Sequence, residues 1–149
     1  MAWANEKLFT ELASLPAECL NATYGPANWT VAHIAAHIVG GNEWYRHLLT
    51  GAEEKNCEPP KSAEEVIALR DYLKTFDAMY LIEAGKPDSL ITFDGYTKNE
   101  QTSREMVLHQ AVYHATEHRA HIATAIEVQG IAKIDLDSYD LWSYYFSQK

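Results

Sequence analysis

Apolar residues recur every three or four positions along four long stretches of the chain, which is the spacing of helices that bury one face. The first stretch carries Leu8, Leu12 and Leu15 on its apolar face, and "YGPAN" breaks the pattern after it. The pattern predicts helices over about residues 3–20, 30–49, 62–83 and 102–129, each separated from the next by Gly, Pro or polar residues.

Sequence signals for helix ends support these boundaries. Ser62 to Glu65 and Thr102 to Glu105 both read as capping boxes, in which a hydroxyl and a carboxylate satisfy free backbone N–H groups at a helix start. Glycine is the preferred residue just past a helix end. The remaining assignments are Asn28 or Thr30 as N-cap of the second helix, Gly51 as its stop, and Gly130 as the stop of the last long helix.

Two shorter segments complete the predicted architecture. "SLITFDGYTKN", within residues 88–100, places β-prone residues on both sides of Asp94-Gly95, a dipeptide preferred in type I′ turns, and predicts a short hairpin or extended loop. "DLDSYDLWSYYF" predicts a short C-terminal helix whose aromatic residues pack back on the body. The absence of alternating strands and helices argues against an α/β sheet. We therefore expect an all-α protein, an antiparallel four-helix bundle forming a single domain over residues 1–149.

Composition and charge narrow the classes of function. The chain has 149 residues, 47 % of them hydrophobic, and a net charge of −9, which argues against a nucleic-acid-binding surface. Cys19 and Cys57 are too few for a disulfide framework. No segment has the apolar length of a membrane span or the uninterrupted core of a signal peptide. We expect a cytoplasmic protein with no nucleic-acid or membrane partner.

The histidines are the candidate functional residues. "HATEHRAH" places His114, His118 and His121 at i, i+4 and i+7, within about 60° of one another on one helical face. "NWTVAHIAAHIVG" contains another i, i+4 pair, His33 and His37. In a bundle, His37 can face His114 and His118 across the core. Three imidazoles around a divalent ion would leave coordination positions open, as catalytic sites require.

A simpler interpretation of His37 requires no metal ion. His37 can be a core residue hydrogen-bonded to a backbone carbonyl, and an isolated i, i+4 pair is weak evidence for metal. His109 lies off the face of the other histidines, and we interpret it as a solvated surface residue.

The two histidine stretches together resemble the signature of the DinB-like (YfiT) superfamily of metal-dependent four-helix bundles. In that superfamily a Trp-Ser/Thr pair opens the second helix, a histidine follows eight residues after the tryptophan, and H-x3-H-R lies on the last long helix. Here Trp29-Thr30 precedes His37, and the second motif is completed by Arg119. The resemblance implies that the metal ligands are His37, His114 and His118.

Three further residues near the motifs have more than one interpretation. His121 stands where the superfamily commonly has Gln; we expect it to line the pocket or contact a ligand, with direct ligation as the alternative. His33 is expected to be structural or exposed. Arg119 is expected to form an ion pair with Glu43 or Asp137, the alternative being anion binding near the pocket.

The resemblance also implies a function. We expect one divalent transition metal ion per chain, Zn²⁺, Ni²⁺ or Fe²⁺, and an enzyme that activates a low-molecular-weight thiol such as mycothiol, bacillithiol or glutathione for transfer to a small electrophilic substrate. One alternative is a metal-dependent hydrolase using metal-bound hydroxide, and another is a non-catalytic, stress-associated metal-binding protein. No Lys/Arg cluster for an anionic thiol accompanies the histidines. We also expect a homodimer.

Overall fold

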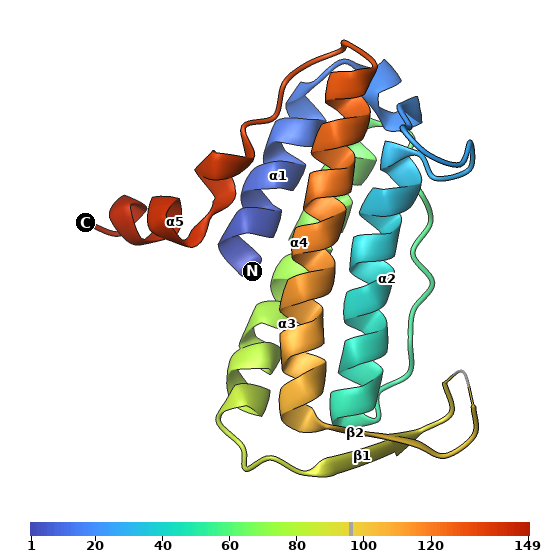
Figure 1. The fold of residues 1–149 in the computed structure, drawn as a ribbon, viewed down its shortest axis with the longest axis vertical. Coiled ribbons are helices and arrows are strands. Elements are labelled where there is room, and N and C mark those ends of the chain that lie inside the picture. The colour runs from blue at the N-terminus through green and yellow to red at the C-terminus, as the bar shows by residue number, and fades with distance from the viewer. Residues whose placement is uncertain (96) are drawn as a thin grey trace.

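The computed structural model describes residues 1–95 and 97–149, which contain five α-helices, two short 3₁₀ helices and a two-stranded sheet. Four long helices lie side by side along the long axis of the molecule (Figure 1). In chain order the elements are α1 (Ala2–Ser14), η1 (Ala17–Asn21), α2 (Val31–Thr50), α3 (Ala63–Ala84), β1 (Leu90–Phe93), β2 (Glu100–Ser103), α4 (Arg104–Val128), η2 (Leu136–Tyr139) and α5 (Leu141–Ser147).

The four long helices pack in pairs. α1 packs on α3, α2 packs on both α4 and α3, and their apolar faces meet in a core of buried aliphatic and aromatic residues. Phe9, Ile34, Phe76 and Ile122 each contribute a fully buried side chain from a different helix. The mostly helical fold predicted from the apolar spacing is confirmed.

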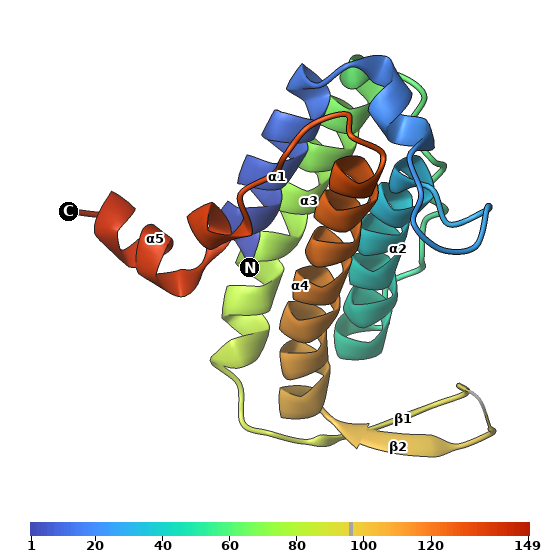
Figure 2. The same cartoon turned by 45° about the horizontal axis from the view of Figure 1, so that its top comes forward.

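The direction of α3 differs from the prediction. α2 and α3 run the same way, whereas α1 and α4 run the opposite way (Figures 1 and 2). The cause is the segment 51–62, which returns along α2 before α3 begins, instead of turning tightly. The expected antiparallel arrangement therefore holds for the pairs α1–α3 and α2–α4, whereas α2 and α3 are parallel.

Local sequence signals explain where the helices begin and end. Thr30, rather than Asn28, caps α2 by accepting the N–H of His33, and Gly51 ends it in the left-handed conformation with φ 73°. Ser62 caps α3 as predicted, while the carboxylate of Glu65 accepts the N–H of Lys61.

Two predicted boundaries shift. α1 ends at Ser14 rather than near residue 20, because the residue before Pro16 is forced towards extended backbone, and Leu15 has ψ 162°. The second predicted capping box is not formed: Thr102 belongs to β2, and Ser103 caps α4 alone by accepting the N–H of Met106.

The predicted hairpin is present, with a longer connection than expected. β1 and β2 pair antiparallel, with Leu90 opposite Ser103 and Phe93 opposite Glu100. Residues 94–99 therefore connect the strands, so Asp94-Gly95 is not a two-residue turn; residue 96 lies outside the described part. Asp94 instead accepts the N–H of Asn99, whose φ is 57°.

The C-terminal helix α5 projects from the body of the molecule (Figures 1 and 2). None of its described residues is buried, and Trp142 is 70 % exposed. The expectation that the aromatic residues of this segment pack back on the body is confirmed for Tyr139 of η2, which is buried in the core. It is wrong for α5 itself, apart from a contact between Tyr144 and Trp3, whose ring centres lie 5.5 Å apart.

Across residues 1–95 and 97–149, we find no helix with both the length and the apolar character needed to span a membrane.

Candidate metal centre

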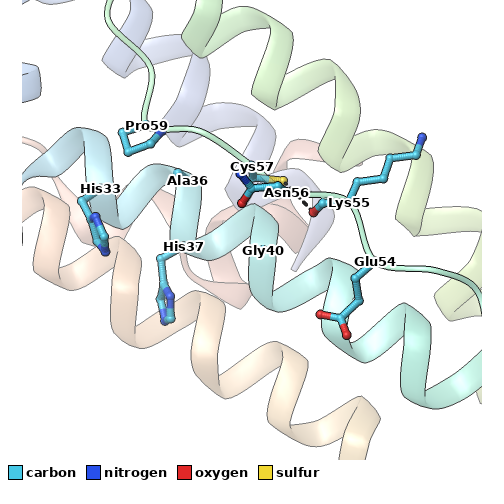
Figure 3. Close-up of a pocket in the computed structure, with 9 residues that line it drawn as sticks. All are labelled: His33, Ala36, His37, Gly40, Glu54, Lys55, Asn56, Cys57 and Pro59. Carbon is cyan, nitrogen blue, oxygen red and sulfur yellow. Dashed lines mark hydrogen bonds between the residues drawn. The ribbon is translucent and has the colours of Figure 1, made fainter.

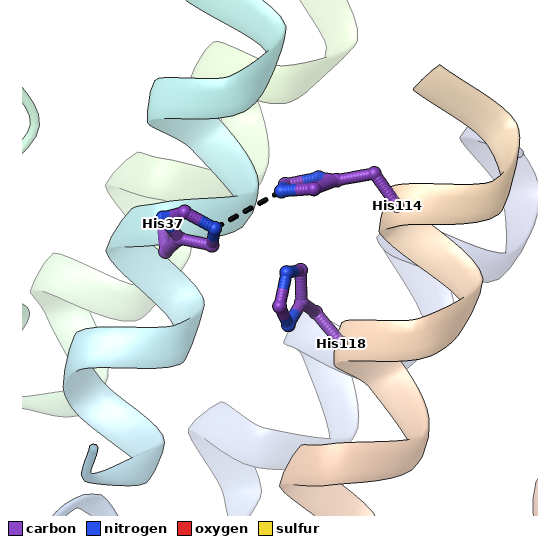
Figure 4. Close-up of side chains that lie close together, drawn as sticks. All are labelled: His37, His114 and His118. Carbon is purple, nitrogen blue, oxygen red and sulfur yellow. Dashed lines mark hydrogen bonds between the residues drawn. The ribbon is translucent and has the colours of Figure 1, made fainter. Parts of the chain in front are cut away.

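Three histidine side chains from two helices converge between α2 and α4 (Figure 4). His37 comes from the second turn of α2, and His114 and His118 lie one turn apart on α4. Each offers a ring nitrogen, and these three nitrogens lie within 4.8 Å of one another. The Nε2 atoms of His37 and His114 are 3.0 Å apart. The structure therefore brings together the three residues predicted as ligands.

A glycine on α2 makes room for one of these rings. A Cβ at Gly41 would lie 2.6 Å from Cε1 and 3.0 Å from Nδ1 of His114, far inside normal van der Waals contact. A Cβ at the neighbouring Gly40 would meet no atom within 4 Å. Gly41 thus permits the close approach of His114 to α2, a role that the sequence pattern did not reveal.

Burial keeps the three imidazoles neutral at pH 7. Burial, followed by the neighbouring imidazoles, lowers the pKa of His114 and of His118 to about 4, and the pKa of His37 is lowered first by burial as well. Neutral imidazole has a free lone pair for a cation. Among the described residues, the buried Nδ1 of His114 finds no hydrogen-bond partner. This set of three neutral ring nitrogens fits a divalent transition metal ion.

His121 and His33 lie beside the cluster in different ways. Nδ1 of His121 is 3.1 Å from Nδ1 of His118, so His121 contacts a candidate ligand, as expected. His33 is exposed, and its ring lies on Trp29 with 5.0 Å between ring centres. The contact of His121 is suited to fixing the orientation of His118, as partners of metal-ligating histidines commonly do.

Trp29 forms an aromatic wall of the cluster. Its ring centre lies 5.1 Å from that of His37 and 5.8 Å from that of His118. The sequence identified Trp29 only through the motif that it completes. In the structure it shields two candidate ligands on one side, which lowers the local dielectric around them.

An open groove of about 560 Å³ adjoins the cluster (Figure 3). His33, His37 and Gly40 of α2 line one side, and the returning segment 54–57 lines the other. Cys57, which has no histidine near it in sequence, lies in this groove. Burial, and then the charge of Glu43, raise the pKa of the Cys57 thiol, so it stays protonated at neutral pH.

A buried carboxylate holds the segment that forms the groove's second side. Glu43 accepts hydrogen bonds from Arg46, from the hydroxyl of Tyr72 and from the N–H of Lys55, and Arg46 also donates to the carbonyl of Glu53. Burial would raise the pKa of Glu43, but the hydrogen bonds from Tyr72 and Arg46 outweigh it and lower the pKa. The anchored segment therefore keeps the groove open beside His37.

Arg119 does not form the predicted ion pair. Its guanidinium donates to Oδ1 of Asn5 at 2.6 Å and to Oγ1 of Thr116 at 2.9 Å, both neutral groups. Glu43, one predicted partner, is engaged by Arg46 on another helix face. Arg119 instead joins α4 to α1.

The remaining histidine on α4 agrees with its prediction: His109 is exposed and lies outside the three-histidine cluster.

Comparisons with known proteins agree with this geometry. The DinB family matches residues 1–144 of the chain. A solved structure of a DinB-like protein from Bacillus cereus ATCC 10987 has a similar fold, with a TM-score of 0.60 and 16 % sequence identity over 88 % of this chain and 89 % of that chain. No curated protein gave a significant match. Because the family match covers nearly the whole sequence, including both histidine motifs, the chain belongs to the DinB family.

Proposed function

We propose that this chain binds one divalent transition metal ion through His37, His114 and His118, on the scaffold of a DinB-type four-helix bundle. The observation that carries the proposal is the convergence of three neutral ring nitrogens within 4.8 Å from two helices. The partial exposure of His37 and the adjoining groove leave one side accessible to a small molecule. A purely structural site would be closed on all sides.

We further propose that the chain is an enzyme that transfers a low-molecular-weight thiol to an electrophile. A bound divalent ion supplies positive charge that stabilises the thiolate form of a coordinated thiol at neutral pH. The chain's own part is to hold the imidazoles in place, to shield them with Trp29, and to admit the thiol and the electrophile through the groove beside His37.

The charges of the residues that line the groove influence which thiol can bind there. Lys55 is the basic residue that lines it, but its ammonium lies 5.2 Å from the ring centre of Tyr72, and its side chain points away from His37 (Figure 3). Glu54 adds a negative charge nearby. The groove thus lacks the cationic cluster that a multiply charged anionic thiol would favour, so the test must include a neutral thiol.

The test begins with metal. Elemental analysis of protein purified without a histidine tag or added metal measures the resident ion, and we expect one equivalent per chain. The Co²⁺- or Ni²⁺-loaded protein is then titrated with mycothiol, bacillithiol, glutathione and neutral 2-mercaptoethanol. A thiol that coordinates produces a sulfur-to-metal charge-transfer band that saturates, and the His118→Ala protein should show none.

Two results separate the parts of this proposal. Absence of bound metal contradicts the metal site. A metal-loaded protein that gives no band with any thiol contradicts thiol transfer and leaves the metal site standing, and hydrolytic activity towards ester or amide substrates would then identify the hydrolase.

A further inference from the structure

A second cavity of about 580 Å³ lies between the start of α1, the middle of α4 and the segment that leads into α5. The N-terminal end of α1 and the η2–α5 segment lie close together at this place (Figures 1 and 2). Its walls are largely aromatic and apolar, and it shares no lining residue with the groove beside His37. Prominent lining residues are Trp3, Val112, Tyr139, Trp142 and Tyr144.

A buried positive charge lines the same cavity. Arg119 is only 7 % exposed, and within residues 1–95 and 97–149 its hydrogen-bond partners are the neutral side chains of Asn5 and Thr116. A guanidinium has five donors and carries its charge at any physiological pH. Burying such a charge beside neutral groups alone is unfavourable, and an anion at the cavity would offset that cost.

A carboxylate that lines this cavity already accepts a backbone hydrogen bond. Asp140 lines it too, but its Oδ1 caps α5 by accepting the N–H of Ser143 at 2.7 Å. The salt bridges found among the described residues do not include Arg119. The guanidinium therefore has donors left for a ligand from outside the chain.

We propose that this cavity binds a small carboxylic acid with an aromatic or apolar body, its carboxylate pairing with Arg119 and its body lying against Trp3, Trp142 and Tyr144. Guanidinium and carboxylate match in planar geometry and form strong, charge-assisted hydrogen bonds. Aromatic walls beside a buried guanidinium favour an amphipathic acid over a strongly hydrated inorganic anion.

The probe for this site is 3-phenylpropionate, compared with its uncharged amide. Isothermal titration calorimetry on the full chain should give saturable binding of the acid, with a dissociation constant of about 1 mM or tighter, as befits a ligand of this size. The amide, which keeps the ring but loses the charge, should bind at least ~10-fold more weakly. Inorganic phosphate should give no saturable signal.

Three variants locate the binding. Arg119→Gln should weaken binding of the acid at least ~10-fold, whereas Arg70→Gln, a change at a half-buried arginine on α3 that pairs with Asp71, should not alter it. Trp142→Ala, at a side chain that is 70 % exposed, removes one wall without disturbing the core and should weaken binding about 5-fold or more.

The proposal is overturned if the acid does not saturate the wild-type protein, if the amide binds as well as the acid, or if correctly folded Arg119→Gln protein binds the acid unchanged. Should Arg119→Gln fail to fold by circular dichroism, the acid–amide comparison and the Trp142→Ala protein decide the question. Because the cavity is separate from the histidine cluster, loss of metal binding would leave this result unaffected.

Discussion

Gly41 and His114 face each other across α2 and α4 so closely that a methyl group on Gly41 would occupy the space of the imidazole, 2.6 Å from Cε1. The candidate metal centre therefore depends on a residue that provides no ligand. Gly40, its neighbour in sequence, has open space at the same atom. The pair offers a matched test of whether the position of His114 determines metal affinity.

We expect Gly41→Ala to weaken metal binding about 10-fold or more, because His114 must move away from the other two imidazoles. Gly40→Ala should leave metal affinity within about 2-fold. Both changes favour the helix by ~0.5–1 kcal/mol, so helix propensity cannot account for a difference between them. Competition with a chromophoric chelator measures both affinities, and equal values would contradict the role assigned to Gly41.

The ligand assignment itself predicts the effect of removing one imidazole. His37→Ala and His118→Ala should each lower metal affinity at least ~100-fold, because two remaining nitrogens hold a divalent ion weakly. His109→Ala, at an exposed histidine outside the cluster, is the control and should retain one ion per chain. The measurement is elemental analysis after gel filtration; full stoichiometry in His118→Ala would show that the ligands are assigned wrongly.

The lowered pKa values of His114 and His118 predict how stability depends on pH in the metal-free protein. The folded chain protonates these rings only near pH 4, whereas the unfolded chain protonates them near 6.5. The unfolded state therefore binds more protons between these values, and the free energy of unfolding falls as the pH is lowered from 6.5 towards 4. Well above the unfolded-state value of 6.5 both states are neutral and the effect vanishes.

Urea unfolding at pH 7 and pH 5 tests this dependence. His118→Asn should lose about 1 kcal/mol less stability over this interval than the wild type, because the ring whose pKa is lowered is gone. His109→Asn should follow the wild type. A wild-type stability that rises on acidification would refute the expected sign.

Neither cysteine is expected to serve as the nucleophile. Burial raises the pKa of Cys19 and of Cys57, which leaves both thiols protonated at neutral pH. Cys57→Ser should therefore keep the thiol-dependent charge-transfer band within about 2-fold in affinity, even though Cys57 lines the groove, and Cys19→Ser should do the same. Loss of the band in Cys57→Ser alone would instead give this cysteine a direct role.

The exposed aromatic residues of α5 are candidates for a homodimer interface. Leu141, Trp142 and Phe146 are each more than half exposed, and a stable interface needs about 800 Å² of buried surface per partner. We expect a homodimer in solution that covers part of α5. Sedimentation velocity at micromolar concentration measures the mass, and deletion of residues 141–149 should shift the protein to monomer; a wild-type protein that sediments as a monomer would contradict the expectation.

The sequence by itself determined the long helices and the part of the site that lies on α4. Apolar spacing defined the long helices, and local chemistry placed several of their ends: the side chain of Thr30 satisfies a free N–H, and Gly51 adopts φ 73°. The i, i+4 spacing alone put His114 and His118 on one face of α4, because a helix turns about 100° per residue. These features depend on neighbours within a few residues.

Tertiary structure decided which residues lie opposite His114 and His118 of α4. The spacing could not fix the direction of α3, because the segment 51–62 is held along α2 by tertiary contacts: Glu43 accepts the N–H of Lys55, and Arg46 donates to the carbonyl of Glu53. The same path brings Cys57 to the groove beside His37. The meeting of His37 with His114, 77 residues apart, depends on how closely α2 and α4 pack. Periodicity specifies which face of a helix is buried, but contacts between distant segments specify its partner.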